Sequence, residues 1–346
     1  MNMGKMEEDG RRREKAGEVG RGLKTILQSF SNPSSVLLQS FFRLLLPVAC
    51  CLLPSGISWA ESTGSTAAEF LKIGVSPRAM ALGSSYTALV DDAYSLHWNP
   101  AGLTRIKHCK ADFQVNSYIQ SIDQHYLAIG YRYNKTDAFG LGVNMLQSTG
   151  IPRTTVSPAG VVSTVGTFGV RDMAFSLGYA RDVTGWLSAG ATAKWISSAI
   201  ASYSADAYAF DAGVQAMPFS FLSLGIAVQN FGHGMKYLTT RDPLPLLMRF
   251  GAAGYLLRNR SLILTMDAHQ ARGDLLYFGF GCEYTLALMH NRYSFRIGYT
   301  SANADVDRGL TFGFGMKLGR WLGFDYAFVP FGVLGDAHRY SMSVDF

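Results

Sequence analysis

The sequence ends Tyr340-Ser341-Met342-Ser343-Val344-Asp345-Phe346, with a large apolar side chain at every second position and an aromatic residue last. Successive side chains of a β-strand point to opposite faces, so this stretch has one apolar face and one polar face. A closed barrel in a lipid bilayer requires that alternation. We therefore predict that these residues form the closing strand of an outer-membrane barrel, with Tyr340 and Phe346 as the signal read by the barrel-insertion machinery.

The same alternation recurs along the chain, for example over residues 127–133, 139–145, 173–179 and 310–316. One face of each segment is apolar, and the other is mostly Gly, Ala and Ser, which suits a crowded lumen better than bulk water. The pattern predicts an all-β transmembrane β-barrel of about 14 antiparallel strands. The predicted strands span 111–119, 125–133, 137–147, 171–181, 185–196, 206–216, 220–230, 247–256, 261–269, 275–285, 292–300, 308–318, 321–329 and 339–346.

Connection lengths support this count. If the first strand runs outward, the connections that follow even-numbered strands are short, as periplasmic turns are. The longest connections, 148–170, 230–246 and 330–338, follow odd-numbered strands and are predicted outer loops. Counts of twelve or sixteen strands stay open at this stage.

Composition narrows the class of protein. Of the residues 48% are hydrophobic and 16% are charged, yet no segment after the predicted signal approaches the roughly 20 consecutive apolar residues of a spanning helix. A membrane protein without such helices is a barrel. Half of the formal charge of +6 lies before residue 61 and the rest is dispersed, so we expect no nucleic-acid partner.

The chain divides into three predicted parts. Residues 1–60 form an N-terminal extension and signal peptide, because Arg43 precedes the apolar run Leu44–Leu53 and small residues precede a cleavage point after about Ala60. Residues 61–108 have the spacing of short amphipathic helices and form a separate element. Residues 109–346 form the barrel, which we place in the outer membrane of a Gram-negative-type bacterium, in contact with outer-membrane lipid.

Charged residues on the polar face of the predicted strands have two interpretations. They can pair across a narrow lumen and hold an internal plug, or some of them can form a polar track for the head group of a solute. The residues are Arg132, Lys194, Asp211, Arg249, Asp267, Glu283, Arg296, Lys317, Asp325 and Asp345. Small residues on the same face leave room for an occupant, and residues 61–108 are the candidate.

Signals for enzyme, metal and cofactor sites are weak. His269 lies two residues from Asp267 and His338 lies two from Asp336, but in a chain rich in Ser such pairs arise by chance. Cys109 and Cys282 remain after the signal, either as a disulfide or as small apolar side chains, and no cysteine spacing resembles a metal site. We therefore expect no enzyme activity, no metal and no cofactor.

One region resembles a known family. Residues 70–83, 88–93 and 98–103, the last reading Trp-Asn-Pro-Ala-Gly-Leu, are similar to the opening of the PorV/PorQ family, which is related to the long-chain fatty acid transporter FadL. The resemblance implies a fourteen-stranded barrel with an N-terminal hatch folded inside the lumen. It also implies a hatch motif made of Asp91, Asp92, Trp98, Asn99, Pro100, Ala101 and Gly102.

Two functions follow from this resemblance. The first is a passive conduit for small hydrophobic or amphipathic molecules across the outer membrane. The alternative is a non-enzymatic component of type IX protein secretion, in which the barrel docks secreted protein cargo. An apolar pocket behind the hatch favours the first function.

Overall fold

The structure is a computed structural model that describes residues 66–118, 122–158, 160, 162–257, 259–301, 309–332 and 335–346. The predicted extension, signal peptide and cleavage point lie outside the described residues. None of the helices in the described ranges is long and apolar enough to cross a membrane.

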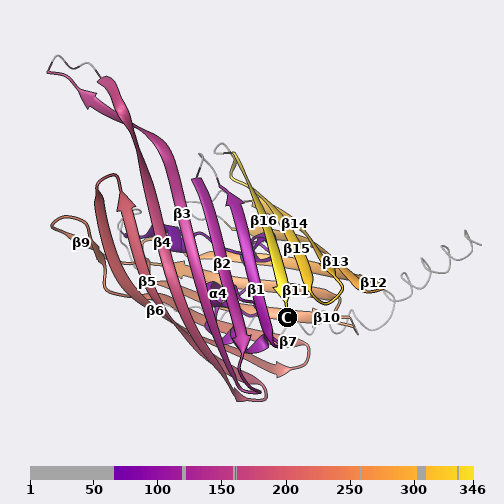
Figure 1. Ribbon diagram of the computed structural model, residues 1–346. Helices are drawn as coiled ribbons and strands as arrows, with labels where there is room; N and C mark the ends of the chain where they lie inside the picture. Colours follow the sequence, from indigo (N-terminus) through magenta and orange to yellow (C-terminus); the bar gives the residue numbers. More distant parts are fainter. Residues whose placement is uncertain are drawn as a thin grey trace, which may run out of the picture. The chain divides into compact units, whose positions relative to one another are not determined.

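Within the described part of the chain, fourteen antiparallel strands close a barrel (Figure 1). Each strand pairs with its neighbours in sequence, and β1 closes the barrel against β16 with Lys110 opposite Asp345 and Ser117 opposite His338. The strands are β1 Cys109–Ser117, β2 Ile122–Arg132, β3 Asp137–Val156, β4 Val162–Thr184, β5 Leu187–Ile200, β6 Tyr203–Phe219, β7 Leu222–Gly232, β10 Leu247–Leu256, β11 Leu262–Ala271, β12 Tyr277–Leu288, β13 Asn291–Thr300, β14 Gly309–Leu318, β15 Leu322–Pro330 and β16 Asp336–Asp345. The prediction of a barrel with about 14 antiparallel strands is confirmed.

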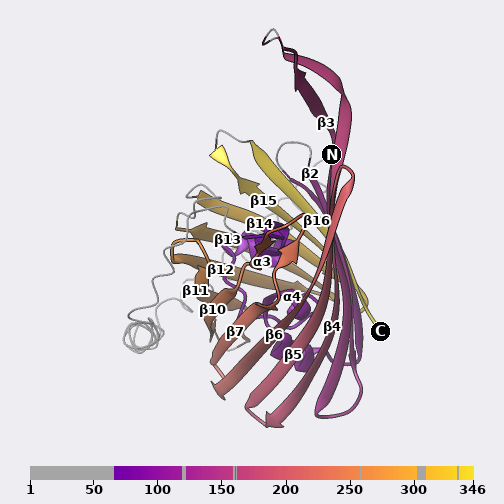
Figure 2. The same ribbon diagram turned by 90° about the vertical axis from the view of Figure 1, so that its left-hand side faces the viewer.

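The upper end of the barrel, where β1, β5, β13 and β15 finish, differs from the prediction in one place. Most of the predicted outer loop 148–170 is strand, as far as Val156 in β3 and from Val162 in β4, so β3 and β4 project beyond the rest of the wall (Figures 1 and 2). Turn-forming residues such as Gly150 and Pro152 suggested a loop. The ladder absorbs them instead as register shifts between Ser148 and Ile151 and between Pro152 and Thr154.

The outward face of the wall is apolar. Large side chains that alternate along the strands are exposed, among them Leu127, Leu141, Leu177, Phe210 and Phe312. Surfaces of this size and composition are stable in contact with hydrocarbon rather than with water. The outward face therefore matches the lipid-facing band expected from the alternation.

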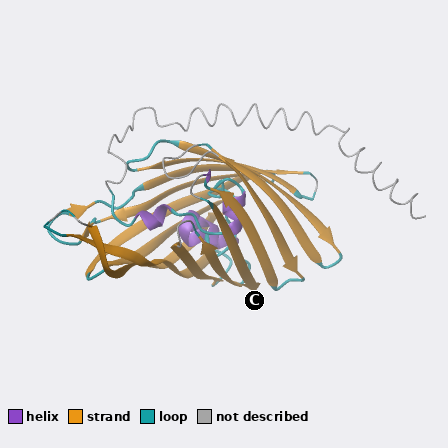
Figure 3. Cartoon of the chain, turned by 90° about the horizontal axis from the view of Figure 1, so that it is seen from above, coloured by secondary structure: helices purple, strands orange, loops and turns teal. Residues whose placement is uncertain are grey.

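Residues 66–106, which we call the inner segment, lie inside the ring of strands (Figure 3). The segment contains four short helices, η1 Glu69–Lys72, α3 Pro77–Ala81, α4 Ser95–Trp98 and η2 Pro100–Arg105. Two of them begin with a capping residue followed by proline: the Ser76 side chain accepts from the amide of Ala79, and that of Asn99 accepts from the amide of Ala101. The spacing predicted short helices, and these residues form them.

Small residues on the inward face of the wall make room for the inner segment. A Cβ on Gly225 of β7 would lie 2.5 Å from the carbonyl oxygen of Thr87, and one on Gly190 of β5 would lie 2.6 Å from the carbonyl carbon of Pro100. On the segment itself, Gly83 has a left-handed φ of +63° and packs against the backbone of Tyr299. The Gly-rich polar face of the strands is therefore a packing surface for backbone.

Candidate functional site

A cavity of about 610 Å³ lies inside the upper end of the barrel. Its lining includes Gly74, Met80 and Trp98 of the inner segment together with residues at the upper ends of the strands, such as Thr300 and Pro330. Aromatic side chains line it as well, namely Phe70, Trp98, Tyr118, Tyr237, Tyr277 and Phe331. Its size and aromatic lining fall in the range of small-molecule binding sites.

The connection between β7 and β10 borders the cavity. This connection contains the short strands β8 (Met235–Lys236) and β9 (Arg241–Asp242), which pair with each other. Met235 and Leu244 are buried in one apolar cluster with Phe70 and Leu71 of the inner segment, and the amide of Ala67 donates to the carbonyl of Pro243 over 2.8 Å. The connection and the start of the inner segment are thus packed together at the upper end.

Two buried arginines line the cavity without a carboxylate partner. Arg249 of β10 is 1% exposed, donates through Nε to Gln229 over 2.9 Å, and holds its guanidinium 4.1 Å from the ring centre of Trp98. Arg339 of β16 is also 1% exposed and donates to the carbonyl oxygen of Gly74. Arg249 Nη1 and Arg339 Nε have no hydrogen-bond partner among the described residues. Buried cations are normally paired with an anion. These two N–H groups can therefore bind an anion by donating hydrogen bonds to it.

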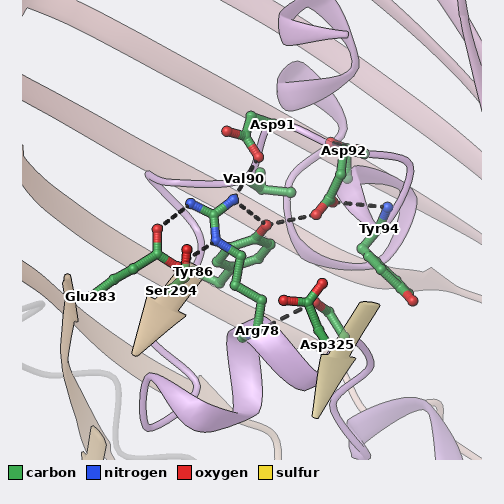
Figure 4. Close-up of polar contacts among 12 residues, drawn as sticks. Arg78, Tyr86, Val90, Asp91, Asp92, Tyr94, Glu283, Ser294 and Asp325 are labelled. Carbon is green, nitrogen blue, oxygen red and sulfur yellow. Dashed lines mark hydrogen bonds and ion pairs between the residues drawn. The ribbon is translucent and has the colours of Figure 1, made fainter. Parts of the chain in front are cut away.

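Ion pairs hold the inner segment to the wall farther down the barrel (Figure 4). Arg78 binds Glu283 of β12 through two hydrogen bonds of 2.8 Å and pairs with Asp91 at 2.9 Å. Arg296 of β13 binds the same Glu283 and Asp325 of β15, each at 2.6 Å. This network joins the inner segment to three strands through charge-assisted bonds.

The hatch-motif residues make contacts within the inner segment and to the wall. The indole nitrogen of Trp98 donates to the carbonyl of Val75 over 2.9 Å. The side chain of Asn99 donates over 3.0 Å to the carbonyls of Thr87 and of Val214 in β6, so it joins two parts of the segment to the wall. Pro100 and Ala101 pack against Gly190, while Gly102 packs against Val90 and Ser95.

The two motif carboxylates lie in different surroundings. Asp91 is exposed and pairs with Arg78 of its own segment. Asp92 is buried, and it accepts from the hydroxyl of Tyr86 over 2.7 Å and from the amide of Tyr94 over 3.1 Å. Burial raises the pKa of the Asp92 carboxyl to about 6. Both carboxylates therefore accept hydrogen bonds from partners within the inner segment.

The remaining predicted charges fall at two depths. Lys194 and Asp211 form a buried ion pair of 2.6 Å between β5 and β6, and one oxygen of Asp267 accepts from the amides of Tyr86 and Thr87. Arg132 instead pairs with Asp182 at the lower rim, and Lys317 pairs there with Asp345. The rim pairs are part-exposed and contribute little to stability.

The residues considered for enzyme chemistry have other partners. The ring of His269 stacks on Tyr277 at 4.7 Å, and His338 Nδ1 bonds to the hydroxyl of Tyr326 at 2.9 Å. Cys109 and Cys282 are free thiols. Among the described residues, no group of three His, Cys, Asp or Glu side chains is placed to hold a metal ion.

Sequence reasoning missed two residues of the site. Arg339 lies on the inward parity of the closing strand, with Ser341 and Ser343, so the alternation itself could have identified it. Arg78 lies in the stretch 70–83 that carries the family resemblance, but a lone arginine in a helical segment gives no sign of its partner 205 positions away.

The sequence matches no protein-family model and no curated protein. Solved structures do match the fold. The CymD monoaromatic hydrocarbon channel has a TM-score of 0.57 at 11% identity, over 78% of this chain and 96% of that chain. The Ralstonia pickettii toluene transporter TbuX has a TM-score of 0.56 at 15% identity, over 78% and 97%.

A Pseudomonas aeruginosa FadL homologue has a TM-score of 0.51 at 12% identity, over 78% of this chain and 97% of that chain. The barrel is FadL-like in fold. At these identities the likeness concerns the fold alone, and the PorV/PorQ resemblance of residues 70–103 stays a prediction.

Proposed function

We propose that this FadL-like chain is an outer-membrane conduit through which small hydrophobic or amphipathic molecules pass without an energy source. The observation that carries the proposal is the aromatic cavity of about 610 Å³ at the upper end of a barrel whose outer face is apolar. The solved structures with this fold include a hydrocarbon channel and a toluene transporter, which supports the same class of solute here.

The cavity favours a solute with one polar end. Aromatic walls bind a flat or aliphatic body, while Arg249 Nη1 and Arg339 Nε, which have no hydrogen-bond partner among the described residues, favour a carboxylate or another anion. An amphipathic anion satisfies both parts of the lining. A neutral hydrocarbon would leave both guanidinium groups without a hydrogen-bonded carboxylate.

Passage also requires the inner segment to give way. Most of its side chains are buried, from Phe70 above to Leu103 below, and they fill the lumen beneath the cavity. We propose that the predicted hatch, residues 61–108, acts as the gate, with the motif residues Trp98 to Gly102 fixing its closed position. The barrel is then closed at rest and opens when the segment shifts.

A reversible crosslink tests this function. The hydroxyls of Ser85 and Thr265 lie 2.5 Å apart, so Ser85→Cys with Thr265→Cys places two thiols at bridging distance between the inner segment and β11. The pair is introduced with Cys109→Ala and Cys282→Ala and reconstituted in phosphatidylcholine vesicles. Entry of the fluorescent anion 2-naphthoate is then followed.

We expect entry when the thiols are reduced and no entry when they are oxidised. The Ser85→Cys single variant, treated in the same way, controls for effects of the oxidant. Absence of entry in the wild type would overturn the proposed function. Equal entry in the reduced and oxidised states of the double-cysteine variant would overturn the gate. Docking of secreted protein cargo remains a prediction from the resemblance alone.

A further inference from the structure

The cavity is lined by charged side chains of both signs. Arg249 and Arg339 line it, and neither forms an ion pair with a carboxylate among the described residues. Asp172 of β4 and Asp242 of β9 also line it, and neither is ion-paired in the described ranges. Lys72, the lysine of the lining, binds two other carboxylates. The cavity therefore offers both cations and anions to a bound molecule.

The two carboxylates of the lining lie close to Tyr237. The hydroxyl of Tyr237 donates to Ser198 over 2.6 Å, and the hydroxyl of Ser198 donates to Asp172. Burial raises the pKa of the Tyr237 hydroxyl, and the neighbouring carboxylates of Asp172 and Asp242 raise it further. An aromatic ring with carboxylates beside it is the combination that binds an organic ammonium ion, through charge-assisted hydrogen bonds and the electrons of the ring.

The bond to Ser198 does not by itself explain a carboxylate at position 172. Asp172 is half-buried; its Oδ1 accepts from Ser198, and its Oδ2 has no hydrogen-bond partner in the part of the chain that the structure describes. An asparagine would accept the same bond without the cost of taking a charge partly out of water. A carboxylate with one unbonded oxygen at the wall of a cavity is better explained by a cationic ligand.

Asp172 and Arg339 face the cavity from different parts of the wall. Arg339 of β16 lies opposite Asn116, and the same row of the ladder continues through Gln124 and Leu146 to Asp172. The two residues are therefore four strands apart, about 19 Å along the wall at the usual spacing of strands. A solute that binds at both residues must carry its positive and its negative group at opposite ends of its body.

We infer that the solute of the cavity is an amphipathic zwitterion, with an organic ammonium group at Asp172, Asp242 and Tyr237 and an anionic group at Arg249 and Arg339. The inference rests on the proposed conduit function and narrows its class of solute. An amphipathic anion binds the arginines and leaves the carboxylates without a cation, whereas a zwitterion supplies a partner to both. The aromatic lining then holds the body between the two charged ends.

Two ligands of the same shape test the ammonium site. The zwitterion 6-(aminomethyl)-2-naphthoate carries an ammonium group and a carboxylate at opposite ends of a rigid aromatic body, and 6-(hydroxymethyl)-2-naphthoate has a neutral hydroxyl in place of the ammonium group. Binding of each to the full chain in a non-ionic detergent is measured by equilibrium dialysis. The zwitterion should bind about tenfold more tightly, as one added charge-assisted hydrogen bond predicts. Equal affinity for the two ligands would overturn the inference.

Asp172→Asn should abolish the preference for the zwitterion. Asparagine still accepts from Ser198 but carries no charge, so binding of the hydroxymethyl ligand should stay the same. Asp206→Asn is the matched control, because Asp206 is exposed on β6 and does not line the cavity; it should keep the preference.

A preference that survives in Asp172→Asn, or that is lost equally in Asp206→Asn, would overturn the ammonium site. Entry of 2-naphthoate into vesicles that hold the wild type would then leave the conduit in place. A wild type that binds neither ligand and admits no 2-naphthoate would overturn the conduit itself. Thermal unfolding shows whether each variant is folded, and the comparison of the two ligands on the wild type decides the inference even if Asp172→Asn does not fold.

Discussion

Arg339 and Arg249 place two guanidinium groups that bind no carboxylate beside aromatic rings in one cavity. Folding gains nothing from an unpaired buried charge, whose removal from water costs several kcal/mol. Their position is therefore better explained by an anionic ligand than by stability. Contacts to Gln229 and to Gly74 hold the two groups in place while leaving Arg249 Nη1 and Arg339 Nε unsatisfied.

Replacing one of these cations should change selectivity. We expect Arg339→Met to weaken 2-naphthoate binding about tenfold or more, since charge-assisted hydrogen bonds are worth about 1.5–3 kcal/mol, and to leave naphthalene binding unchanged. Arg339→Lys keeps the charge and should retain most of the affinity. Equal losses for the charged and the neutral ligand, measured by equilibrium dialysis, would mean that Arg339 only supports the shape of the cavity.

Asp92 gives the inner segment a pH dependence. Burial raises the pKa of its carboxyl to about 6, so the folded protein holds a proton that the unfolded chain releases near pH 4. Its contribution to stability is thus full below about pH 4 and is lost as the pH rises to about 6, by up to about 3 kcal/mol. We expect urea unfolding in detergent micelles to become easier across this window.

Asp92→Asn should make that pH profile less steep without abolishing the slope, because the buried carboxyls of Asp112 and Asp267 remain. Asp91→Asn, on the exposed neighbouring carboxylate, is the matched control and should keep the slope. If both variants kept the wild-type slope, the buried carboxyl would not be the titrating group.

The packing of the inner segment against strand glycines is a property of whole elements. A Cβ on Gly225 would meet the carbonyl of Thr87, a backbone atom that cannot turn away. We expect Gly225→Val to destabilise the folded protein by about 1–3 kcal/mol, as overpacking does, and to make the inner segment accessible to protease. Gly185→Ala, in a turn with no neighbour within 4 Å, should do neither, and protease resistance in Gly225→Val would argue against tight packing.

The closing strand carries the assembly prediction. β16 pairs with β1 along its length, and the amide of Phe346 donates to the carbonyl of Cys109 over 2.9 Å. Deleting Phe346 should lower the yield of heat-modifiable protein in the membrane fraction, while Phe346→Trp, which keeps a terminal aromatic, should restore it. A normal yield for the deletion would mean that insertion into the membrane does not depend on Phe346.

Element periodicity explains which parts of the fold the sequence could predict. A strand repeats every two residues, so apolar alternation located β10 and β15 within about a residue of their bounds. The same periodicity could not predict that β3 continues past residue 148 or that β4 starts before residue 170. Gly and Pro in this stretch are typical of turns. Small inward residues predicted a crowded lumen, since glycine leaves room for the backbone and side chains of an occupant.

Pairwise contacts between distant elements explain what the sequence could not predict. The bonds of Arg78 to Glu283 depend on how α3 is turned inside the barrel, and no local pattern reports that angle. The cavity likewise depends on where the connection between β7 and β10 folds. Inward parity gave Arg249 as a candidate, but its lack of a carboxylate partner became visible only in three dimensions.

At the scale of the whole molecule, the account depends on the inner segment closing the lumen. The segment contacts glycines on most strands of the wall, is bound to Glu283 and Asp267 by polar bonds, and leaves the cavity above it. The described residues thus form one closed assembly in which the barrel supplies the wall and the inner segment supplies the barrier.

Single-channel conductance in planar lipid bilayers tests this barrier most directly. A variant that lacks residues 64–98 and keeps β1 is compared with the full chain, after heat-modifiable migration has shown that both barrels are folded. We predict low conductance for the full chain and a clearly larger, steady conductance for the deletion variant. Equal conductance in the two folded proteins would contradict the account, because the inner segment would then not be what closes the barrel.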